Sequence, residues 1–180
     1  MALNPALLDL LARALTYPDA ATPALLAECQ AAGGWADPAA AEPLGRFAAA
    51  VAGDSVEAMQ ERFTGAFDFD PKSSLDIGWH LYGENYDRGD FLVRMREALA
   101  AHGVEEGVDL PDHLPHVLQL LARMPADAAS ALGRDSVIPA LDKILAGLDG
   151  RETPYEHVVR SVHAAVSGFA PAVLGDAIHV

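Results

Sequence analysis

The spacing of the leucines near the N-terminus constrains the fold more than any other feature. Leu7, Leu8, Leu11 and Leu15 recur at intervals of three and four residues, directly after an Asn-Pro pair at 4–5. Residues so spaced share one face of an α-helix, and asparagine followed by proline is typical of a helix start. No stretch of four or more residues alternates apolar and polar side chains between hairpin turns. The sequence therefore predicts an all-α fold.

The helical pattern continues along the chain. It predicts helices over about 5–17, 22–33, 38–53, 54–67, 74–82, 87–101, 113–124, 125–132, 135–149 and 154–168. Asp54 and Asp135 are expected to cap two of them. The run Thr-Pro-Tyr-Glu at 153–156 matches a capping box, with proline at the first helical position.

Length and composition favour one domain. At 180 residues and 51% hydrophobic, the chain can bury a sizeable core, and it shows no internal repeat or low-complexity linker. We expect a single all-α domain over 1–180, a bundle of about eight to ten short to medium helices. Loops at 68–74 and 104–111 are expected to be flexible, and either can serve as the hinge of a homodimer. The tail at 169–180 is expected to be loose.

The charge excludes two classes of partner. Lys and Arg number 12 against 26 Asp and Glu, a formal net charge of −14. Nucleic acid and anionic membrane surfaces require clustered cations, which this chain lacks. Either a cationic partner or a plain acidic, soluble surface is consistent with that balance.

Cysteine usage and hydropathy indicate a cytoplasmic location. Cys29 is the single cysteine, so no internal disulfide forms, and its place in an expected helix favours a small core side chain. The first residues lack the basic region of a signal peptide. No apolar run approaches the roughly 20 residues that span a bilayer, so no membrane insertion is expected.

Catalytic motifs are missing. With only two lysines the chain has no phosphate-binding loop, and it has no Gly-x-Ser-x-Gly, Cys-x-x-Cys or His-Glu-x-x-His pattern. The expectation is no enzyme, no cofactor and no metal. One alternative stays open, a metal-binding helical enzyme that uses His80, Asp112, His113 and His116, although a capping aspartate with partly buried histidines explains the same residues.

Three segments, in order, resemble a known family. They are Phe-Thr-Gly-Ala-Phe-Asp at 63–68, Trp-His-Leu-Tyr-Gly-Glu-Asn-Tyr-Asp-Arg-Gly at 79–89, and Leu-Pro-Asp-His-Leu-Pro at 110–115. Together they resemble the cytosolic assembly chaperones for molybdenum enzymes, of the NarJ/TorD/DmsD type, and the nitrate reductase delta-subunit branch most. The likeness covers about 63–121. The segment between Tyr82 and Arg88 is shorter than in the nitrate reductase chaperones, which leaves a related molybdenum enzyme as an equally good client.

The resemblance implies a function without catalysis. Such chaperones bind the N-terminal segment of a molybdopterin-containing catalytic subunit, a twin-arginine signal or its remnant. They hold the subunit until the cofactor is inserted, and so delay export or membrane docking.

The residues suit that task. Trp79 and Tyr82 lie three apart, so one helical face presents two aromatic anchors, although a core position explains Trp79 equally well. Carboxylates near them can take an arginine in bidentate fashion, or form only a solvated acidic face. Asp112 is also placed to cap a helix that starts at His113. The residues expected to bind the peptide are Trp79, His80, Tyr82, Glu84, Tyr86, Arg88, Asp109, Asp112 and His113.

Overall fold

The computed structural model describes residues 2–170, and it confirms the all-α prediction. Its helices are α1 (Pro5–Ala14), α2 (Thr22–Ala31), α3 (Pro38–Ala50), α4 (Val56–Phe67), α5 (Ile77–Tyr82), α6 (Tyr86–Ala101), α7 (Leu114–Arg123), α8 (Ala126–Leu132), α9 (Ile138–Leu148) and α10 (Tyr155–Phe169). Two 3-10 turns, η1 (Ala32–Gly34) and η2 (Pro71–Ser73), and a π-turn, η3 (Gly133–Val137), lie between them.

Polar side chains cap several helices, though not always the expected ones. Asn4 accepts a hydrogen bond from the N–H of Leu7, which starts α1 as predicted. At α4 the expectation was wrong by one residue, because the hydroxyl of Ser55 caps the helix. Asp54 instead forms an ion pair with Arg62 at 2.6 Å.

Two further expected helix starts need correction. Asp135 does not cap α9, because it lies within the π-turn η3, through which the chain passes from α8 to α9 without leaving the helical region. At α10 the capping box does not form, because the helix begins at Tyr155 and its N-cap is Pro154, not Thr153. Thr153 accepts a hydrogen bond from the N–H of Tyr155, whereas Glu156 pairs with Arg160 on the next turn.

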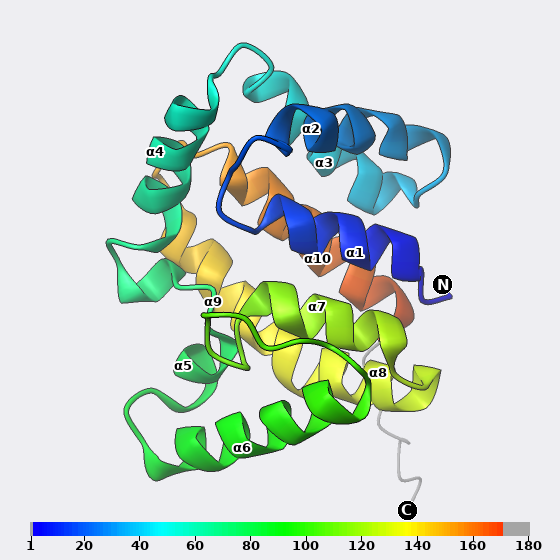
Figure 1. Cartoon of the computed structure of the whole chain (residues 1–180), viewed down its shortest axis with the longest axis vertical. Coiled ribbons are helices and arrows are strands. Elements are labelled where there is room, and N and C mark those ends of the chain that lie inside the picture. The colour runs from blue at the N-terminus through cyan, green and yellow to red at the C-terminus, as the bar shows by residue number, and fades with distance from the viewer. Residues whose placement is uncertain (1, 171–180) are drawn as a thin grey trace, which may run out of the picture.

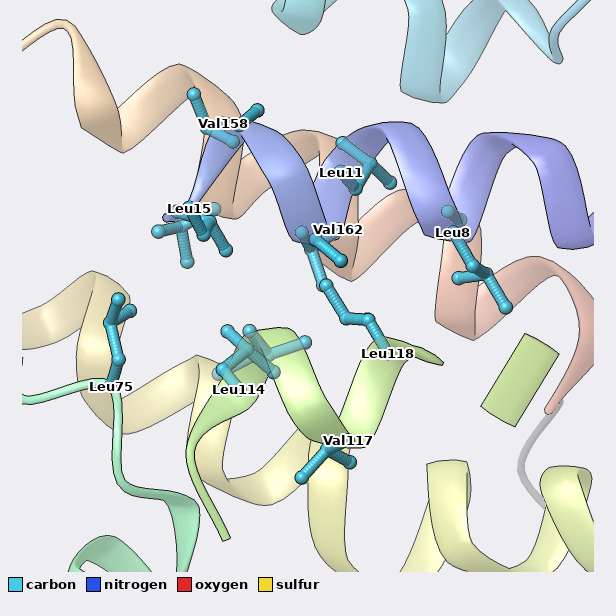
Figure 2. Packing of buried hydrophobic residues seen from close by; sticks show 14 of the residues in the cluster. Leu8, Leu11, Leu15, Leu75, Leu114, Val117, Leu118, Val158 and Val162 are labelled. Carbon is cyan, nitrogen blue, oxygen red and sulfur yellow. The ribbon is translucent and has the colours of Figure 1, made fainter. Parts of the chain in front are cut away.

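The helices form one bundle around a leucine- and valine-rich core. Figure 1 shows α1 between the α2–α3 pair on one side and α7 on the other, with α10 running behind it. Figure 2 shows leucines of α1 and α7 meeting valines of α10, including Leu11, Leu118 and Val162. These side chains are essentially solvent-free. Full burial of each contributes about 1.5–3 kcal/mol.

Cys29 belongs to this core, as predicted. Its side chain is fully buried in α2, and burial raises the pKa of the thiol to about 12. A neutral, enclosed thiol is a poor nucleophile.

The two expected loops differ. The segment 68–74 contains the turn η2. There the hydroxyl of buried Ser73 donates a hydrogen bond of 2.6 Å to the carbonyl of Ala66. The segment 104–111 contains no helix. The flexibility expected of both segments stays a prediction.

The tail that was expected to be loose, 169–180, starts within the last helix. Phe169 is the last residue of α10 and Ala170 is buried, while the rest of that tail, 171–180, lies outside the described residues. None of the helices within 2–170 has both the length and the apolar character that crossing a bilayer requires.

Candidate functional site

Residues 75–77 and 112–114, which are far apart in the sequence, cross at the start of α5. The N–H of Ile77 donates to the carbonyl of Asp112 at 3.1 Å, and the N–H of Leu114 donates to the carbonyl of Leu75 at 2.9 Å. The two bonds form an isolated antiparallel bridge between Asp76 and His113. This crossing joins the Leu-Pro-Asp-His-Leu-Pro segment at 110–115, here called the Asp-His segment, to the start of α5, the helix that carries Trp79.

A groove of about 560 Å³ opens at the crossing. All three segments that carry the family resemblance contribute to its walls. Its aromatic side chains are Phe63 and Phe67 of α4 and Trp79 of α5. Four aspartates also line it: Asp68, Asp70, Asp76 and Asp109. The groove therefore combines apolar surface with negative charge.

The aromatic floor rests on the last helix. Phe63 and Phe67 are almost fully buried, and each packs edge-on against Tyr155 at the start of α10, with ring centroids 5.4 Å apart. Since Tyr155 itself is 1% exposed, the floor is fixed by the core and does not depend on the loops around it.

Asp76 organises the charges in the groove. Its Oδ1 lies 3.0 Å from Nδ1 of His113, and its Oδ2 lies 3.6 Å from Nη2 of Arg88. The guanidinium of Arg88 sits over the ring of Trp79, 5.6 Å from its centroid. Three of the predicted site residues, Trp79, Arg88 and His113, therefore meet around an aspartate that was not predicted.

Asp112 supports the site from below. Its side chain is fully buried, and its Oδ2 accepts a hydrogen bond of 2.8 Å from the N–H of Gly78 in the first turn of α5. Asp112 therefore caps α5, and the prediction that it caps its own helix was wrong, because α7 begins two residues later, at Leu114. Burial, reinforced by the nearby charge of Asp76, raises the pKa of the Asp112 carboxyl.

Asp109 lines the groove, but Asp112 and four other residues expected to bind the peptide do not. His80 is buried, and its Nε2 lies 2.7 Å from the carbonyl oxygen of Ser74. Burial lowers the pKa of His80, so the ring is neutral near pH 7. Tyr82 packs against Phe91, with ring centroids 5.4 Å apart. Glu84 and Tyr86 are exposed around the turn that leads into α6, and neither lines the groove.

Sequence reasoning missed part of the lining. Asp68 ends the first motif segment, Asp70 follows it and Asp76 precedes the second, so their positions in or beside the motifs were the available signal. Val108 and Leu110 also line the groove, and both are unusually exposed for apolar side chains. They add apolar surface to the edge of an otherwise acidic loop.

The metal-binding alternative gains no support from the geometry. Within residues 2–170, no three histidine, cysteine, aspartate or glutamate side chains are placed to hold a metal ion. The histidine that lines the groove, His113, is already bonded to Asp76.

Fold and groove together define an all-α protein whose candidate binding surface is aromatic and acidic. Residues 35–155 match the family described as nitrate reductase delta subunit, and the chain belongs to that family. The crossing and all of the groove residues fall inside the matched region.

Similar proteins agree with this membership. The chain is 34% identical over 97 residues to the nitrate reductase molybdenum cofactor assembly chaperone NarJ of Escherichia coli (strain K12), and equally to that of Escherichia coli O157:H7. The alignment covers 53% of this chain and 41% of each relative, so it spans less than half of their length. The resemblance to the nitrate reductase branch is confirmed.

Proposed function

We propose that this chain is an assembly chaperone that binds the N-terminal segment of a molybdenum-enzyme catalytic subunit. It holds that subunit in the cytoplasm until the molybdopterin cofactor is inserted, and it catalyses no reaction itself. The observation that carries the proposal is the groove, because the three segments typical of the family build one surface. The relatives named as nitrate reductase chaperones favour nitrate reductase or a related enzyme as the client.

The chemistry of the groove suits such a segment. A signal-like peptide carries arginines followed by an apolar stretch that can become helical. Aromatic side chains in a groove accept the apolar face of such a helix, and carboxylates hold the arginines. Phe63, Phe67 and Trp79 supply the first kind of contact, and the four aspartates that line the groove supply the second.

Calorimetry on two tryptophan variants tests the proposal. The client is first identified by pull-down from the native cell and mass identification, and a peptide of its first residues is then titrated into the protein. Trp79→Ala is expected to weaken binding by about tenfold or more, because a buried aromatic anchor contributes about 2 kcal/mol or more.

Trp35→Ala is the matched control, since Trp35 is the other tryptophan of the chain, is 48% exposed and does not line the groove. Equal weakening by both variants would show that the groove is not the binding site. Absence of binding to the wild-type protein would overturn the proposed function itself.

A further inference from the structure

We propose that the face of Trp79 and the carboxylate of Asp76 form a subsite for a guanidinium group, which Arg88 occupies while the groove is empty. An arginine of the client takes the same place in the complex. This inference rests on the proposed function, since it says which part of the peptide the groove selects.

Arg88 is present in the groove but is loosely held. It is the only arginine or lysine that lines the groove in the part of the chain that the structure describes. Its distance of 3.6 Å from Asp76 exceeds that of a hydrogen bond. Its Nε is buried and has no partner, which costs free energy that release into water would recover.

The position of Arg88 in its helix also favours release. Arg88 is the third residue of α6, in the first turn, where the positive end of the helix dipole disfavours a cation. About a fifth of its side chain is already exposed. The backbone enters α6 through Gly83, which has a positive φ of 60°, and the cap Asn85. The side chain of Arg88 is not part of the hydrophobic core.

The subsite stays in place when Arg88 leaves. Asp76 is fixed by His113 and by the backbone bridge at the crossing, neither of which involves Arg88. Asp112 lies behind it, fully buried, with an Oδ1 that has no hydrogen-bond donor. An aromatic face and an anchored carboxylate form a site complementary to a planar cation with five N–H donors.

The first measurement needs no client. Trp35→Phe leaves Trp79 as the single tryptophan, so that its fluorescence reports on the subsite. In that background, Nα-acetyl-arginine amide is titrated into three proteins: the parent, Arg88→Met and the double variant Arg88→Met/Asp76→Asn. The Arg88→Met protein is expected to show saturable binding at about threefold to tenfold lower concentration than the parent, because the internal competitor is gone. Addition of Asp76→Asn is expected to remove this gain.

Arg94→Met is the matched control. Arg94 lies on the same helix, stacks on Phe91 with its guanidinium 6.0 Å from the ring centroid, and does not line the groove. It changes the net charge by the same amount as Arg88→Met, so a gain from lost long-range repulsion would occur in both variants. Equal gains, or weaker binding by Arg88→Met, would overturn the proposal, and the second result would make Arg88 a direct contact for the ligand.

The second measurement uses the client peptide, and it separates the two proposals. Arg88→Met is expected to lower the Kd of the peptide that contains arginine, but not the Kd of the same peptide with citrulline in place of arginine. If the free arginine derivative behaves as expected and the client peptide does not bind, the subsite stands and the proposed function fails. If the peptide binds and Arg88→Met gives no arginine-specific gain, the function stands and the subsite fails.

Discussion

At the scale of single residues, Asp112 contributes most to the site without touching its interior. The carboxylate caps α5 through Gly78 across 34 positions of sequence, and it thereby holds the Asp-His segment against the tryptophan helix. A cap so distant in sequence leaves no local pattern. Trp79, Arg88 and His113 were predictable from the motifs, and Asp109 from the acidic residues near them, but the burial of Asp112 was not.

Replacing Asp112 by asparagine is expected to change the pH dependence of stability. Because the pKa of Asp112 is raised in the folded protein, the native state binds this proton more tightly than the unfolded chain does. The wild-type protein therefore loses stability from this group as pH rises from the ordinary range of an aspartate through the raised pKa. Asp112→Asn keeps an acceptor for Gly78 and has no such loss. Its free energy of unfolding should therefore rise relative to that of the wild type as the pH increases.

Urea denaturation between about pH 4 and pH 7 measures this difference. Asp127→Asn, an exposed aspartate of α8, is the control and should give a difference that is small at every pH. A wild-type advantage that grows with pH would contradict the assignment of Asp112 as a buried group that favours its proton.

At the scale of elements, the presence of each helix was predictable, but the start of a joined helix and the buried face of a short one were not. Ten expected helices correspond to α1 to α10, yet the start of α9 was wrong, because the Gly-Arg-Asp run at 133–135 forms a π-turn instead of a break. The six residues of α5 make fewer than two turns, too few for the apolar pattern to show which face is buried. That is why His80, expected in the groove, lies in the core.

Gly147 in α9 allows the turn η2 to pack closely against that helix. A Cβ at Gly147 would come within 2.1 Å of the carbonyl oxygen of Lys72, a backbone atom of η2. Gly147→Ala is therefore expected to lower the free energy of unfolding by about 2 kcal/mol or more, because the two elements must separate.

Gly65→Ala is the matched control for that substitution. Gly65 lies in the interior of α4, and no atom is within 4 Å of the Cβ position. Here alanine should stabilise the protein by about 0.5–1 kcal/mol through helix propensity. Thermal or urea unfolding measures both, and a neutral Gly147→Ala would contradict the close packing of α9 on η2.

At the scale of the whole molecule, part of the net charge of −14 gathers in one groove. Four of the 26 acidic residues line one groove beside a single arginine, so part of the charge is concentrated where a cationic segment would dock. The net charge alone predicts a cationic partner or a soluble acidic surface. Only the fold shows which aspartates share a surface. Asp68 and Asp109, for example, are 41 residues apart in the sequence.

Binding of an arginine-bearing client peptide is expected to weaken with salt. Exposed charges more than about 10 Å apart are screened at 0.1 M ionic strength, and nearby pairs weaken further as salt is added. Raising NaCl from about 0.05 M to 0.5 M should increase the Kd by about tenfold. Calorimetry measures this, with Asp68→Asn/Asp109→Asn expected to flatten the dependence. An affinity that does not fall with salt would rule out electrostatic capture.

The support of the groove floor by Tyr155 has a consequence for the order of events during synthesis. Phe63 and Phe67 leave the ribosome about 90 residues before the tyrosine on which they rest, which takes about 5–18 s at an elongation rate of about 5–20 residues per second. A nascent chain that ends before α10 lacks that support. The finished groove therefore forms only after translation has reached the last helix, which makes it one of the last features of the molecule to be completed.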